Sequence, residues 1–166
     1  MTEQKPSREA LEAWLALTRG SAPSDLQGRT IALPVLSGSM LPDIPPGTTL
    51  LITPIAPDAC RVGDVVVFSE GQYRLVAHRL LWRLRLGRWS WCFQKGDNNP
   101  FGGWIRSRRI CGLALRLAAP GEDGTAPVEQ SVLYKPQRVR QSLRAHLRNR
   151  LLLWPRRIRK RLFGVD

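Results

Sequence analysis

Two closely spaced serines and a distant histidine have the side-chain types that nucleophilic catalysis requires. Ser37 and Ser39 flank Gly38 in a turn that follows an apolar run, and prolines within residues 42–46 restrict the backbone after it. A serine hydroxyl becomes a useful nucleophile when a base within hydrogen-bond reach removes its proton. Because Ser-Gly-Ser is also a common loop sequence, the rest of the chain has to supply that base.

His78 is the candidate base, since histidine otherwise occurs only at position 146. It lies in an apolar stretch with the composition of a strand, and an imidazole suits proton transfer near neutral pH. A structural core histidine is the alternative interpretation. His146 lies in a basic, helical stretch and is given no catalytic role. Asp97, in a Gly-Asp-Asn-Asn turn, could accept a hydrogen bond from His78 and fix its tautomer; the local alternative is a self-bonded Asx turn.

Composition indicates a folded domain with an unusually basic surface. The chain has 166 residues, 43% of them hydrophobic, and a formal net charge of +13, which argues for a real core and against global disorder. Cys60, Cys92 and Cys111 are widely spaced and form no Cys-x-x-Cys pair. We therefore expect core thiols in a reducing compartment, with no disulfide framework, zinc site or other cofactor.

Turn signals divide the middle of the chain into short segments of strand length, which predicts a mainly antiparallel β body over residues 31–117. Within residues 80–86, apolar residues alternate with arginine, which is typical of a strand with one side in water. Residues 7–18 read as a short amphipathic helix followed by a linker, and residues 118–131 as a loop. The predicted strands are 30–36, 48–53, 65–69, 73–86, 88–94 and 109–117.

The last segment is strongly basic, with Asp166 as its only acid. A helix would gather its regularly spaced apolar residues on one side, and Pro155 should bend or divide that helix. Three interpretations stay open: contact with an anionic bilayer surface, packing on the body or a partner, and, less favoured, binding of nucleic acid. The apolar residues are Val139, Leu143, Leu147, Leu151, Trp154, Ile158 and Leu162.

The chain is thus predicted to have three parts: an N-terminal helix and linker (1–28), a β domain (29–134) and a basic amphipathic helical tail (135–166). Four motifs span the β domain in a fixed order: Ser37-Gly38-Ser39-Met40-Leu41-Pro42, Arg61-Val62-Gly63-Asp64-Val65-Val66, Ala77-His78-Arg79 and Lys95-Gly96-Asp97-Asn98-Asn99. Together they resemble the ordered sequence boxes of type I signal peptidases. A histidine stands where the commoner bacterial enzymes carry a lysine, so the chain is more similar to the endoplasmic-reticulum, archaeal and sporulating-bacterium branch.

The resemblance implies a mainly β fold: a signal-peptidase-like antiparallel β body, shared with certain self-cleaving repressors, with a short N-terminal helix and a basic amphipathic C-terminal helix. It implies Ser39 as nucleophile, His78 as general base and Asp97 as the partner that orients the imidazole. The oxyanion hole would consist of the Ser37 hydroxyl and the backbone N–H of Ser39.

The implied reaction is serine endoproteolysis that removes a leader or signal-type peptide from a precursor polypeptide. The substrate would lie extended along a sheet edge, beside Met40 and Pro42, with small residues just before the cut. The precursor is the expected partner, with peripheral contact to an anionic membrane through residues 135–166, and no nucleic acid.

Two features depart from that family. No apolar stretch is long enough to span a membrane and residues 1–6 lack the core of a signal peptide, so we expect a cytoplasmic or peripherally membrane-associated protein. No second acid follows Asp97 within residues 100–104.

The alternative function is a catalytically degenerate peptidase fold that binds membrane or nucleic acid through its tail. A self-cleaving repressor would need a Ser–Lys pair and an N-terminal DNA-binding domain.

Overall fold

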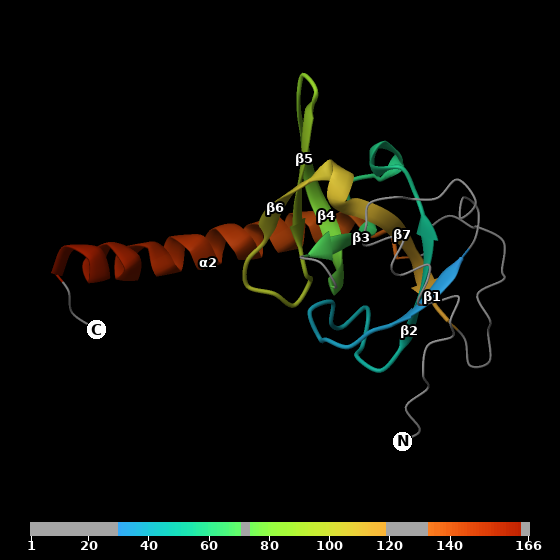
Figure 1. The fold of residues 1–166 in the computed structure, drawn as a ribbon. Helices are drawn as coiled ribbons and strands as arrows, with labels where there is room; N and C mark the ends of the chain where they lie inside the picture. The colour runs from blue at the N-terminus through green and yellow to red at the C-terminus, as the bar shows by residue number, and fades with distance from the viewer. Residues whose placement is uncertain (1–29, 71–73, 119–132, 164–166) are drawn as a thin grey trace.

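Within residues 30–70, 74–118 and 133–163, which a computed structural model describes (side chains through Leu151), seven antiparallel strands form a curled sheet (Figure 1). The predicted mainly β class is therefore confirmed. The expected helix at 7–18, its linker and nearly all of the 118–131 loop lie outside the described residues. The strands are β1 (Ile31–Pro34), β2 (Thr49–Pro54), β3 (Val65–Glu70), β4 (Arg74–Leu86), β5 (Trp89–Lys95), β6 (Gly103–Arg106) and β7 (Ile110–Leu117).

The strand order, β1-β2-β7-β3-β4-β5-β6, puts β3 in the middle of the sheet. Side chains of β3 alternate between two hydrophobic clusters: Val65 and Val67 belong to one, and Val66 and Phe68 to the other. Both faces of the central strand are therefore buried, which explains why its sequence is continuously apolar. The first cluster also contains Met40, so the core holds the serine turn in place.

The outer half of β4 has the expected alternation but the opposite orientation. Arg83 donates to the carbonyl oxygens of Pro57 and Asp58 in a short 3-10 helix (Pro57–Ala59), whereas the apolar residues that alternate with it face solvent. The cause is a bulge in the pairing with β5 between Leu80 and Trp82. A bulge adds one unpaired residue, so the side-chain phase reverses beyond it.

Helix α2 (Pro136–Phe163) runs without interruption through Pro155, so the proline does not divide it. Its first turns pack on the sheet, where Val139 clusters with Leu81 of β4 and Phe93 of β5. The helix then continues past β6 (Figure 1). Within the described part of the expected apolar stripe, Val139 is buried but Leu147 and Leu151 are exposed. Its later residues, Trp154, Ile158 and Leu162, lie beyond the described side chains. None of the described helices is both long and apolar enough to cross a bilayer.

Candidate active site

A groove of about 830 Å³ runs between the β1 segment and the first half of β4, with residues of β2 and β3 beneath it. Ser37, Ser39 and Met40 line the groove from the β1 side, and His78 lines it from β4. The fold therefore brings the predicted nucleophile and the predicted base, which are distant in sequence, to one depression. The groove walls are otherwise mostly apolar, with Leu33, Val35, Leu50, Val67, Leu75 and Ala77 among them.

The serine turn is compact because its own backbone closes it. The Leu41 N–H donates to the Gly38 carbonyl at 3.2 Å, and the Ser37 hydroxyl lies 3.4 Å from that of Ser39. Met40 is almost completely buried and anchors the turn in the core. Met40 lines the groove, whereas Pro42 is exposed and lies outside its lining, so contact between Pro42 and substrate stays a prediction.

Gln94 of β5 holds the His78 ring. Its side-chain oxygen lies 2.5 Å from Nδ1 of His78, and because an amide oxygen only accepts, Nδ1 carries the proton. Nε2 then keeps its lone pair. It lies 3.5 Å from the Asn99 side-chain nitrogen, and Asn99 also lines the groove. A neutral imidazole with Nε2 unprotonated is the form that a general base needs.

The surroundings of His78 also keep it neutral. Burial lowers the pKa of the imidazole below its ordinary value, and the hydrogen bond that His78 donates to Gln94 and the charges of Glu70 and Asp97 offset part of that shift by raising it. The net direction is downward, so the base form prevails at pH 7.

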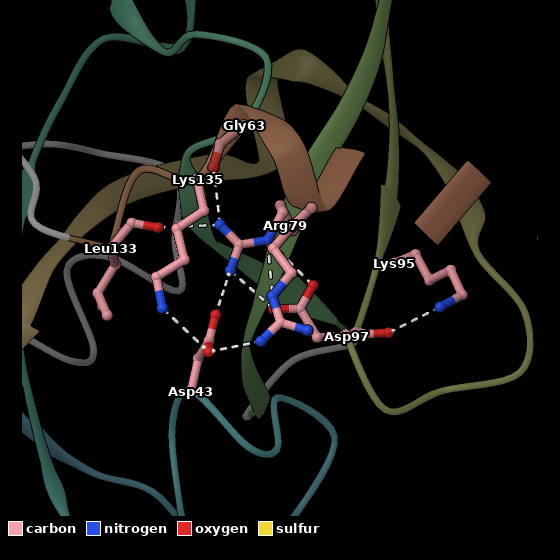
Figure 2. A network of polar contacts seen from close by, with 9 residues as sticks. Asp43, Gly63, Arg79, Lys95, Asp97, Leu133 and Lys135 are labelled. Atoms are coloured by element: carbon pink, nitrogen blue, oxygen red, sulfur yellow. Dashed lines mark hydrogen bonds and ion pairs between the residues drawn. The ribbon is translucent and has the colours of Figure 1, made fainter. Parts of the chain in front are cut away.

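Asp97 does not take the position expected of it. Its carboxylate pairs with the guanidinium of Arg79, with Nε 3.0 Å from Oδ1 and Nη2 2.7 Å from Oδ2, and both side chains are nearly excluded from solvent (Figure 2). The prediction that Asp97 orients His78 by a hydrogen bond is thus corrected, since Gln94 occupies Nδ1. Asp97 acts on the imidazole only through its charge.

Arg79 is a structural residue that the sequence interpretation missed. Besides Asp97, its guanidinium donates to the carbonyls of Gly63 at 2.8 Å and Leu133 at 2.9 Å, and to Asp43 at 3.2 Å (Figure 2). These partners belong to the turn before β3, the approach to α2 and the loop after the serine turn. The available signal was an arginine next to His78 in an otherwise apolar stretch, residues 75–82.

The loop after the serine turn is further fixed by the start of α2. Lys135 lies 3.0 Å and Arg138 3.2 Å from the Asp43 carboxylate. Burial alone would raise the pKa of Asp43, but these two cations and Arg79 bring it below its ordinary value. Helix α2 is therefore joined electrostatically to the loop that follows the candidate nucleophile.

The Gly-Asp-Asn-Asn loop clamps the serine turn directly. The backbone N–H of Asn98 donates to the Ser39 carbonyl at 2.9 Å, and its side chain donates to the Gly38 carbonyl at 3.2 Å. At Gly96 an added Cβ would lie 2.6 Å from the Ser39 carbonyl oxygen and 2.9 Å from the Asn99 side chain. Only glycine allows this approach, so the loop and the turn form one unit.

Should the site cleave peptides, as proposed below, Gly96→Ala would lower kcat/KM because the new methyl group must displace the Ser39 carbonyl or Asn99. Displacements approaching 1 Å cost on the order of 10²-fold in rate. Peptide-cleavage kinetics would measure the loss. Gly87→Ala, at a positive-φ hairpin turn with open space around it, is the matched control and should retain the rate; an unimpaired Gly96→Ala protein would contradict the clamp.

The cysteines offer no competing nucleophile. Cys60, Cys92 and Cys111 are free and buried, and burial raises the pKa of Cys60 and Cys111 to about 12. Both therefore stay protonated thiols at neutral pH, and a thiol is a poor nucleophile compared with a thiolate. Among the described residues, no group of three or more His, Cys, Asp or Glu side chains is placed to hold a metal ion.

No protein-family model matches the chain, and no match was found among the curated proteins. The likeness of its four motifs to the signal-peptidase boxes therefore remains a prediction.

Proposed function

We propose that this protein is a serine endopeptidase of the signal-peptidase type that acts on a precursor polypeptide. Ser39 is the nucleophile, His78 the general base, and Gln94 the residue that orients the imidazole. The observation that supports this most is the placement of Ser39 and His78 in one groove, with His78 held in the tautomer that leaves Nε2 unprotonated, 3.5 Å from the Asn99 side-chain nitrogen.

In the proposed acylation step, the Ser39 oxygen attacks the scissile carbonyl carbon while its proton passes to Nε2 of His78. Collapse of the tetrahedral intermediate breaks the C–N bond, and His78 returns that proton to the leaving amine. Water then attacks the acyl ester with His78 again as base, which releases the acid product and restores Ser39. Acid–base help of this kind contributes roughly 10²–10⁴-fold.

The tetrahedral oxyanion would be stabilised by the Ser37 hydroxyl and the Ser39 backbone N–H. Among the described residues no hydrogen bond occupies that N–H, whereas the carbonyls of Gly38 and Ser39 are both taken by Asn98. The clamp therefore fixes the peptide planes of the turn and leaves a donor available. Loss of one such donor typically costs about 10²–10³ in kcat.

The substrate would bind as an extended strand beside β1, which is an edge strand that pairs only with β2 in the described sheet. Residues 32–36 form one side of the groove and residues 74–78 the other. Backbone pairing to such an edge supplies affinity, and the apolar walls select alternate side chains. This arrangement favours small or apolar residues near the cut, as in a leader peptide.

The direct test is cleavage of a mixed peptide library, with new termini identified by mass spectrometry. The wild-type protein should generate new termini with one dominant sequence pattern, and His78→Ala, confirmed as folded by its urea denaturation, should generate none. Cleavage by His78→Ala at the wild-type rate would exclude the assigned base. A library that the folded wild type never cleaves would instead support the catalytically degenerate alternative.

We expect kcat/KM to be level above the ordinary histidine pKa of 6.5 and to fall only as the pH drops below it, because burial lowers the pKa of His78 and the neutral imidazole is the active form. Gln94→Glu should move this fall to higher pH, since a carboxylate favours the imidazolium. Gln94→Leu should move it lower and reduce the plateau, since it removes the bond that fixes the tautomer. Rate profiles over about pH 5–9 would measure these two shifts. Profiles of both variants that are identical to that of the wild type would refute the role of Gln94.

A further inference from the structure

The outer halves of β4, β5 and β6 share an apolar, aromatic face that the proposed chemistry does not use. Directly paired residues on neighbouring antiparallel strands point to the same side of a sheet. The pairings Trp82–Phe93–Trp104, Leu84–Trp91–Arg106 and Leu86–Trp89 therefore define one surface, here called the aromatic face: Trp82, Leu84, Leu86, Trp89, Trp91, Phe93, Trp104 and Arg106.

Most of this face is exposed. The exposed fractions are 56% for Trp82, 60% for Leu86 and 51% for Trp104, and Leu84 and Trp89 are also exposed. A contiguous group of large apolar side chains in water usually marks an interaction surface. The hairpin tip between β4 and β5 projects from the rest of the body (Figure 1), so this surface is accessible.

The charges around the aromatic face are basic. Arg106 lies over the rings of Trp89 at 4.8 Å and Trp91 at 5.4 Å, and Arg88 lies 5.4 Å from Trp89. The sequence contains no Asp or Glu in residues 71–96 or 98–121, from which the face is built. A partner that complements this face would have an apolar layer and negative charge.

Helix α2 extends the same surface. The ring of Phe93 contacts His146 of α2 at 5.1 Å, and Phe93 also contacts Trp104 at 5.2 Å. Further along α2, Leu147 and Leu151 are exposed, and residues 130–165 contain no acid. The aromatic face thus continues into a helix that combines exposed leucines with arginines.

We propose that the aromatic face, together with the adjoining part of α2, docks on the surface of an anionic lipid bilayer. Tryptophan rings favour the membrane–water interface, leucines at a projecting tip can enter the acyl boundary, and nearby arginines are attracted to anionic headgroups. Single-stranded nucleic acid fits less well, because its bases stack on flat rings and gain little from Leu84 and Leu86.

Docking in this way would hold the groove close to the membrane. His78 and Trp82 lie on the same strand, four residues apart, which corresponds to about 13 Å. Should the proposed peptidase activity hold, the groove would be positioned for precursors that emerge from or remain attached to the bilayer. The docking itself depends only on the aromatic face, so the two proposals can fail separately.

The test is sedimentation of the full-length protein with vesicles of phosphatidylcholine alone or mixed with phosphatidylglycerol. The wild type should bind the anionic vesicles, less so at high salt, and the triple variant Trp82→Gln/Leu84→Gln/Leu86→Gln should bind at least about tenfold more weakly. Val62→Gln, an exposed apolar position in the turn before β3, is the control and should bind as the wild type does. Brominated acyl chains should quench the tryptophan fluorescence of the wild type and not that of the triple variant.

Wild-type binding by the triple variant would overturn the proposal. The proposal would also be overturned if the triple variant lost binding to a single-stranded oligonucleotide, or lost self-association in light scattering, while its binding to vesicles was unchanged. Should the triple variant fail to fold, Arg88→Glu at the hairpin tip must weaken anionic-vesicle binding, and an unchanged affinity would count against docking equally. Cleavage of soluble peptides should be the same for all these variants, which separates docking from catalysis.

Discussion

Ser39→Ala is expected to reduce kcat/KM for peptide cleavage by about 10³-fold or more, because the variant lacks the oxygen that we propose attacks the scissile carbonyl. Folding should be unaffected, since Ser39 is only half-buried and the clamp holds its backbone carbonyl rather than its hydroxyl. Cleavage kinetics and urea denaturation would measure the two effects separately.

The double variant Ser39→Ala/His78→Ala sharpens that test. Residues that act as one unit give non-additive losses, so the double variant should be little slower than Ser39→Ala alone. Two independent contributions would instead multiply. A multiplied loss would show that His78 acts on something other than the Ser39 proton.

Arg79→Met is expected to lower the free energy of unfolding by about 3–5 kcal/mol, the usual effect of removing one partner from a buried ion pair. The substitution leaves the Asp97 carboxylate, 2% exposed, without its cation and removes two donors from the carbonyls of Gly63 and Leu133. Asp43 keeps Lys135 and Arg138. Denaturant unfolding would measure the change.

The matched control is Arg85→Met, which breaks an ion pair to Asp58 of 2.8 Å whose side chains are 63% and 64% exposed. Exposed pairs contribute at most about 1 kcal/mol, so this variant should unfold almost as the wild type does. Arg79→Met/Asp97→Leu should recover part of the lost stability by removing the unpaired charge. An Arg79→Met protein as stable as the control would contradict the structural role of Arg79.

Much of the sheet was predictable because Gly and Pro mark the ends of its strands. Strand β6 was missed, since Gly103–Arg106 is only four residues long and begins at a glycine. The outward orientation of Trp82 was also missed, because a bulge reverses the side-chain phase and no residue type signals its position. Helix α2 was predicted, but which of its faces packs on the sheet depends on the tertiary contacts of Val139 and His146.

In the site, the order of the motifs was enough to associate Ser39 with His78. It was not enough to choose the partner of Nδ1, which depends on the β4–β5 register. That register sets Leu80 opposite Gln94 and Arg79 opposite Lys95. As a result, Gln94 lies within hydrogen-bond reach of His78, and Asp97 pairs with Arg79. Carboxylates are the usual partners of a catalytic histidine, and this expectation favoured the wrong residue.

The most direct test of the account is to trap the acyl intermediate. The wild-type protein would be quenched in acid during cleavage of a peptide taken from the library, digested, and mapped by mass spectrometry. The account predicts a mass increase equal to the acyl half of the peptide, located on Ser39 and absent from the His78→Ala variant. An adduct on any other residue, or full turnover by Ser39→Ala, would contradict it.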